Sequence, residues 1–176
     1  MKFPHVMLDL ETMSSDPTAA VIQIGAVPFS LEDIGPGFKT TIDLEDSMRY
    51  GTVSGPTIKW WMEQADAARK SVMSGTRTLR QGLQDFGDWM RGLEGGGHKV
   101  WAHATFDHPI LLNAYSKSNL IRPFHYRQCR DLRTLEEFWG GGIEWPSRKN
   151  VHHDALDDAI FQAEAARLML RKAWGK

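Results

Sequence analysis

The chain is poor in cysteine, lacks a long hydrophobic run and carries almost no net charge. Its single cysteine, Cys129, excludes an internal disulfide and suits a reducing environment. No apolar stretch approaches the roughly 18 residues of a membrane-spanning helix, and no signal peptide opens the sequence. We therefore expect a cytoplasmic protein with no membrane partner. The net charge of −1 argues against a generally basic protein that coats nucleic acid, although it leaves a local nucleic-acid site open.

The composition is that of a folded protein. Hydrophobic residues make up 41% of the 176 residues and charged residues 24%, unlike the low-hydrophobicity, high-charge composition of disordered chains. This length is enough for one domain with a sizeable core. We expect a single domain over residues 1–176.

The pattern of apolar residues and turn signals predicts strands first, then helices mixed with strands. Three strands are expected at 5–11, about 20–29 and about 37–44, joined by turns such as "SSDP" and "EDIGPG", which favours an antiparallel meander. A further short strand is expected at 99–103. Helices are expected at 57–73, 79–93, about 105–119, 129–138 and 155 to about 173. The last of these has a stripe of mostly small residues at helical spacing, which permits close packing against a sheet: Ala155, Ala159, Ala163, Ala166 and Leu170. The predicted fold is α/β, a mixed central sheet flanked by helices, and the glycine-rich segment 140–150 reads as a mobile flap.

The first predicted strand, in "HVMLDLETMS", carries two acidic residues in an apolar run. Side chains alternate along a strand, so Asp9 and Glu11 lie on one side, about 6–7 Å apart at Cα, with Leu8 and Leu10 on the other. Two buried carboxylates this close repel one another and raise each other's pKa, and a hard divalent cation such as Mg²⁺ or Mn²⁺ would relieve that repulsion. The alternative is a half-exposed strand with solvated charges.

Two later segments also carry acidic residues at helix starts. Asp107 follows Phe106 at the beginning of a predicted helix, where a negative charge also favours the helix dipole. His153 and Asp158 flank the start of the last helix. Asp154 is a suitable N-cap and Asp157 a capping partner three residues later, so we interpret these two as structural. Asp158 lies deeper in the helix than capping requires.

Together, Asp9-x-Glu11-Thr12, Phe106-Asp107 and His153-x₄-Asp158 resemble the motifs of the DEDDh family of 3′–5′ exonucleases, which have the ribonuclease-H-like fold. The order of the three motifs, their separations along the chain and their positions on a strand or at a helix start match those of the family. The resemblance extends from residue 5 to about residue 170. The segment "TIKWWMEQADAAR" (57–69) is similar to a branch of small bacterial and phage enzymes that contains exoribonucleases and DNA exonucleases.

The resemblance implies a two-ion active site. Asp9, Glu11 and Asp158 would hold one Mg²⁺ or Mn²⁺ ion, Asp9 would bridge to a second ion served by Asp107, and His153 would be the general base. Such an ion pair, roughly 3.5–4 Å apart, suits phosphodiester hydrolysis because it contacts both the attacking and the leaving oxygen. A histidine with a pKa near 6.5 can accept the water proton near neutral pH.

The resemblance also implies substrate contacts, from Thr12, Met13, His103 and Phe106. Many relatives have Asn three or four residues before the Phe-Asp pair, where this chain has His103, a difference that concerns the nucleotide contact and leaves the metal ligands intact. Trp60 and Trp61 lie about 100° apart on a helix, so both cannot face the core. We take Trp61 as the candidate for stacking on a base, with core packing as the alternative.

The predicted activity is therefore metal-dependent 3′–5′ hydrolysis of single-stranded RNA or DNA to nucleoside monophosphates. The expected partners are nucleic-acid 3′ ends, with a second copy of the chain in a homodimer as a further candidate. Two alternatives are a catalytically inactive nucleic-acid-binding module and a proofreading subunit of a polymerase. The filled catalytic positions argue against the first, and the absence of a long tail beyond the motifs argues against the second.

Overall fold

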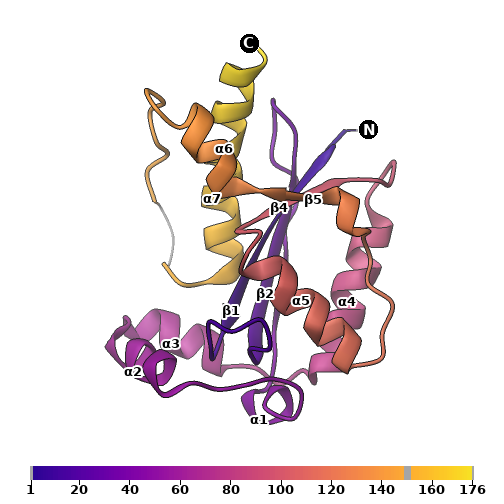
Figure 1. Ribbon diagram of the computed structural model, residues 1–176, viewed down its shortest axis with the longest axis vertical. Helices are drawn as coiled ribbons and strands as arrows, with labels where there is room; N and C mark the ends of the chain where they lie inside the picture. Colours follow the sequence, from indigo (N-terminus) through magenta and orange to yellow (C-terminus); the bar gives the residue numbers. More distant parts are fainter. Residues whose placement is uncertain (1, 149–151, 176) are drawn as a thin grey trace.

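A five-stranded mixed sheet forms the centre of the protein, in the order β3-β2-β1-β4-β5 (Figure 1). The computed structural model describes residues 2–148 and 152–175. The strands are β1 (His5–Thr12), β2 (Val21–Phe29), β3 (Phe38–Thr41), β4 (Lys99–Ala102) and β5 (Cys129–Asp131). The first three strands pair antiparallel, whereas β4 pairs parallel with β1 and β5 pairs parallel with β4. The predicted mixed sheet with an antiparallel meander is confirmed.

Helices cover both faces of this sheet. They are α1 (Leu44–Ser47), α2 (Gly55–Glu63), α3 (Asp66–Met73), α4 (Leu79–Gly92), α5 (Asp107–Lys117), α6 (Leu132–Trp139) and α7 (Ala155–Ala173), with a 3₁₀ turn at Tyr126–Gln128. Apolar residues of α4 and α5 pack in one core cluster with β1 and β2, and those of α6 and α7 pack in a second cluster (Figure 1). Among the described residues, no helix has the length and apolar character that crossing a membrane requires.

Strand β1 is buried along its whole length, and its two sides differ. Val6, Leu8 and Leu10 belong to the cluster that α4 and α5 complete. Met7 belongs to the cluster on the side of α6 and α7, and Asp9 and Glu11 follow it at alternating positions, hence on the same side. The carboxylates are therefore buried beneath α7, and the alternative of a half-exposed strand is wrong.

Helix α7 approaches the sheet closely because small residues line its inner side. Ala155, Ala159 and Ala163 have no exposed surface, in keeping with the predicted stripe. At the helix start the contact is with the backbone of β2: a Cβ atom added to Gly25 would lie 2.1 Å from the carbonyl carbon of Ala155. Since Gly25 is the register partner of Asp9, the start of α7 lies next to the acidic end of β1.

Two predicted helices are wrong in part. The predicted helix 57–73 is divided into α2 and α3, because the backbone is extended at Gln64 and Ala65, with ψ of 162° and 145°. The predicted helix 129–138 begins only at Leu132, where the Asp131 side chain caps it. Residues 129–131 form the edge strand β5, which is too short to show the alternation that identifies a strand.

The glycine-rich segment 140–150 is a loop, as predicted, over the part that the structure describes. Residues 140–148 contain no helix or strand, and Gly140 is the C-cap of α6. Residues 149 and 150 lie outside the described residues. The mobility of this flap stays a prediction.

Candidate active site

Four carboxylates from three elements converge beneath α7. Asp9 and Glu11 come from β1, Asp107 from the first residue of α5 and Asp158 from the first turns of α7, and each is at most 8% exposed. Asp9, Glu11 and Asp158 each offer an oxygen within 4.8 Å of the others. Asp9 and Asp107 form a second such group with a ring nitrogen of His103. The structure thus brings all four predicted ligands together, with Asp9 common to both groups.

Hydrogen bonds hold Asp107 and Asp9 in place. Asp107 Oδ1 accepts from the backbone N–H of Leu10 at 3.2 Å, and Oδ2 accepts from the N–H of His103 at 2.9 Å. Gln162 Nε2 donates to Asp9 Oδ1 at 2.7 Å. Sequence reasoning missed Gln162, although its position one helical turn after Asp158 puts it on the same face of α7 and was a usable signal.

The electrostatics of the cluster disfavour ionised carboxylates without a counterion. Burial, followed by the neighbouring Asp107, Glu11 and Asp158, raises the pKa of Asp9 well above its usual value. Burial and Asp158 raise the pKa of Glu11 to about 8. Burial raises the pKa of Asp107 to about 7, although hydrogen bonds from the backbone of His103 and Leu10 act to lower it. A crowded, buried set of oxygen donors fits a hard divalent cation.

One cationic side chain reaches this cluster from the loop 140–148. The guanidinium of Arg148 pairs with Asp158 Oδ1 and lies over the ring of Phe161, 4.2 Å from its centroid. Arg133 lines the same cavity from α6. Neither arginine belongs to the motifs that identified the carboxylates, and loop residues have no periodicity that would have pointed to Arg148.

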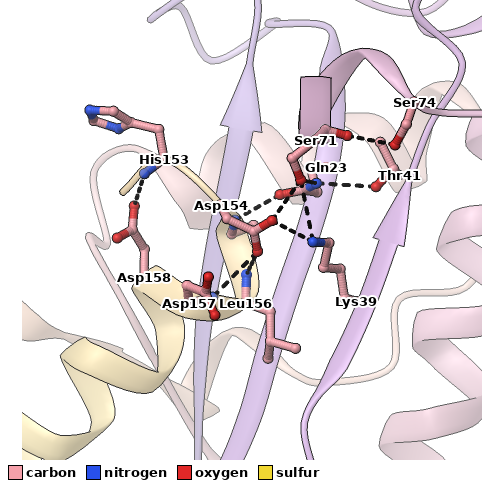
Figure 2. Close-up of polar contacts among 11 residues, drawn as sticks. Gln23, Lys39, Thr41, Ser71, Ser74, His153, Asp154, Leu156, Asp157 and Asp158 are labelled. Carbon is pink, nitrogen blue, oxygen red and sulfur yellow. Dashed lines mark hydrogen bonds and ion pairs between the residues drawn. The ribbon is translucent and has the colours of Figure 1, made fainter. Parts of the chain in front are cut away.

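His153 lies immediately before α7, at the edge of the acidic cluster. Its backbone is left-handed, with φ of 64°, and its N–H donates to Asp158 Oδ2 at 3.1 Å (Figure 2). A ring nitrogen of His153 lies within 4.8 Å of an Asp158 oxygen, in a group that also includes a ring nitrogen of His152. The ring meets Trp60 edge to face, with centroids 4.6 Å apart. Burial and the neighbouring His152 lower the pKa of His153, which favours the neutral imidazole, the form that accepts a proton.

A cavity of about 480 Å³ opens over the carboxylates. Among the predicted substrate-binding residues, its wall includes Thr12, Trp61, His103 and Phe106. Met13 instead lines a neighbouring apolar groove, and its N–H and carbonyl bond to Ala20 and Ser54 within the fold.

The two tryptophans of α2 differ in exposure. Trp61 is 6% exposed and its indole N–H donates to the carbonyl of Thr12 at 3.0 Å, whereas Trp60 is 38% exposed on the cavity wall. Trp60 therefore offers the larger accessible ring surface.

The fold is shared with solved exonucleases. A solved full-length 3′-exonuclease superposes with a TM-score of 0.64 at 16% identity, over 98% of this chain and 62% of the other. Pop2p of S. pombe, solved in a form with Mg²⁺ and Mn²⁺ bound, gives a TM-score of 0.61 at 13% identity, over 98% and 84% of the two chains. This chain thus spans less than two thirds of the first structure.

Sequence comparison narrows the class to a family. The model of the Rv2179c-like 3′–5′ exoribonuclease domain matches residues 4–170, so the chain belongs to that family. An exodeoxyribonuclease of Enterobacteria phage T4 is 27% identical over 158 residues, which cover 74% of this chain and 70% of the phage protein. The family found by comparison confirms the resemblance read from the three motifs, and it favours the enzyme over a non-catalytic binding module.

Proposed function

We propose that the protein is a divalent-metal-dependent 3′–5′ exonuclease that removes nucleoside monophosphates from the 3′ ends of single-stranded RNA or DNA. One observation carries this proposal: the four buried carboxylates form two groups of ligand atoms that share Asp9. A carboxylate shared between two groups can bridge two adjacent cations, and burial together with the neighbouring carboxylates raises the pKa values of Asp9 and Glu11.

The ligand set suits Mg²⁺ or Mn²⁺. Asp9, Glu11 and Asp158 would hold one ion, and Asp9 with Asp107 the other, through carboxylate oxygens that hard cations prefer. When bound, two such ions supply stabilisation of the charge that develops on the attacking and leaving oxygens of an in-line displacement. The fold relative Pop2p, with Mg²⁺ and Mn²⁺ bound, supports this choice of ions.

His153 would remove the proton from the attacking water. The imidazole belongs to the cavity wall, and the hydrogen bond from its own backbone N–H to Asp158 keeps it beside the carboxylates. Its lowered pKa leaves the ring neutral near pH 7, so that it can accept a proton. His152 lies next to it in the sequence, and comparison of the two histidines tests this assignment.

The cavity wall offers contacts that do not depend on base identity. Trp60 and Phe106 present aromatic surface on which a base can stack, and Arg133 and Arg148 present positive charge to phosphates. We therefore propose weak sequence preference. The family is named for exoribonucleases and the phage relative for an exodeoxyribonuclease, so both RNA and DNA belong in the assay.

The test uses 5′-labelled single-stranded RNA and DNA with purified protein. With Mg²⁺ or Mn²⁺ we expect a ladder of products that shorten from the 3′ end, no shortening in EDTA, and slower shortening when the 3′ end carries a phosphate. A persistent mobility shift without shortening in any metal would contradict the proposal and favour a nucleic-acid-binding module.

A further inference from the structure

The carboxylate of Asp154, between His153 and α7, divides its two oxygens between two tasks. Asp154 is 5% exposed. Oδ1 caps α7 and accepts from the backbone N–H of Leu156 at 3.2 Å and of Asp157 at 3.5 Å. Oδ2 accepts from the hydroxyl of Ser71 at 2.6 Å and pairs with the ammonium of Lys39 (Figure 2). Helix capping uses only Oδ1, so the contacts of Oδ2 need another explanation.

Gln23 of β2 joins the same network from the other side. Its Oε1 accepts from the N–H of Ala155 at 2.7 Å, and its Nε2 donates to Thr41 Oγ1 and to Ser71 Oγ, both at 3.1 Å (Figure 2). Lys39 Nζ also donates to Ser71 Oγ at 3.3 Å. Three elements, β2, β3 and α3, therefore hold the two residues at which α7 begins.

The network also has a fixed relation to the acidic strand. Gln23 is the register partner of Glu11, and Gly25 that of Asp9. The contact between Gly25 and the backbone of Ala155 leaves no room for the helix to move closer to the sheet. Any displacement of the helix start would have to break the bonds to Ser71, Lys39 and Gln23.

We propose that Gln23, Lys39, Ser71 and Asp154, here called the α7 clamp, position His153 for catalysis together with the first turn of α7. These are positioning residues, since they act through His153, and the inference rests on the proposed function. His153 directly precedes Asp154 in a left-handed backbone conformation that side-chain-bearing residues seldom adopt. The clamp holds this backbone from one side, and the bond from the His153 N–H to Asp158 holds it from the other.

Three variants separate positioning from capping. Ser71→Ala and Lys39→Met remove donors to Oδ2 and leave the capping oxygen of Asp154 in place. Asp154→Asn keeps a good capping side chain but puts an amide where one carboxylate oxygen was, so it cannot satisfy both the cap and the clamp. Thr78→Ala, which removes the N-cap of α4 away from the cavity, is the control for a lost helix cap alone.

We expect each clamp variant to lower kcat about 10–100-fold, the usual effect of removing a group that orients an active-site residue, with KM within about twofold of wild type. Thr78→Ala should lower the melting temperature and leave kcat unchanged. Clamp variants that lose thermal stability but keep the wild-type kcat would overturn the proposal and leave the network a purely structural role.

A double-mutant cycle with His153→Ala shows whether the clamp acts through that histidine. If it does, a clamp substitution should cost only a few-fold in kcat once His153 is absent, because groups that act as one unit are not additive. An undiminished cost in that background would overturn the proposal. The His153→Ala variant is measured first. If it keeps the wild-type rate, His153 is not the general base. The clamp proposal then fails as well, because the clamp is proposed to act through His153.

Discussion

Glu11 and Asp154 are two carboxylates with little exposed surface, 7% and 5%, whose pKa values are shifted in opposite directions. Burial and the nearby Asp158 raise the pKa of Glu11 to about 8, and Asp107 adds to the effect. Burial would also raise the pKa of Asp154, but hydrogen bonds from Lys39 and Ser71 outweigh it and hold the pKa below its usual value.

Both side chains have little exposed surface, but their partners differ. The fold itself supplies a cation and a hydroxyl to Asp154, so the charge of this residue is satisfied by the protein alone. The charged groups that act on Glu11 are Asp158, Asp107 and Asp154, all of them carboxylates that raise its pKa further. The first arrangement is typical of a structural acid and the second of a metal ligand.

The largest expected difference between the two is in activity. Glu11→Gln should lower kcat by about 10⁴-fold or more, because the ions contribute several kcal/mol to the transition state and about 1.4 kcal/mol corresponds to a factor of ten. Asp154→Asn should cost about 10–100-fold. Single-turnover rates on a 3′-hydroxyl oligonucleotide measure both. Equal losses would contradict the distinction between a ligand and a positioning residue.

A second difference separates adjacent histidines. His153→Ala should lower kcat roughly 10²–10⁴-fold, the usual contribution of a general base. His152→Ala, the matched control, should change it far less. Both proteins should bind Mn²⁺ nearly as wild type does, since neither change removes a carboxylate ligand. The reverse order of the two effects would show that the base has been assigned to the wrong histidine.

The third difference is in the sign of a stability change. In EDTA at pH 7, Glu11→Gln should raise the melting temperature by several degrees. Folding raises the pKa of Glu11 from 4.5 to about 8, so the folded protein must take up a proton that the unfolded chain does not hold at pH 7, and glutamine avoids that cost. About 1 kcal/mol corresponds to ~2–4 °C in a chain of this size. Asp154→Asn should lower the melting temperature, because it breaks the pair with Lys39. Calorimetric melts of both variants check this. A lower melting temperature for Glu11→Gln would show that Glu11 stabilises the metal-free protein, and would contradict the raised pKa.

The smallest expected effect is on the pH dependence of stability. A carboxylate with a raised pKa binds protons more tightly in the folded state, so stability falls as pH rises from the unfolded value to the folded one. For Glu11 this interval runs from 4.5 to about 8. Metal-free wild type should therefore lose stability across this interval, and Glu11→Gln should lose less. Parallel curves for the two proteins in urea titrations would contradict the raised pKa.

The sequence was sufficient for the parts of the molecule that have a repeating pattern or a spaced motif. Alternation in β1 predicted the shared side of Asp9 and Glu11, and the alanine spacing of α7 predicted its close packing. The edge strand β5 was missed because three residues are too few to show a period. The break between α2 and α3 was missed because neither glycine nor proline marks Gln64–Ala65. The clamp was missed for a further reason: capping explained Asp154, and its partners lie 83 and 115 positions away in the sequence.

Calorimetric titration of Mn²⁺ into the metal-free protein at pH 7 tests the central claim most directly. The account predicts binding of two ions to wild type, with release of protons that is visible as a dependence of the heat on the buffer, because Glu11 has a pKa of about 8 and must ionise to bind. Glu11→Gln should bind far more weakly and Asp154→Asn should retain both ions. Absence of binding to wild type, or an equal loss in the two variants, would contradict the account.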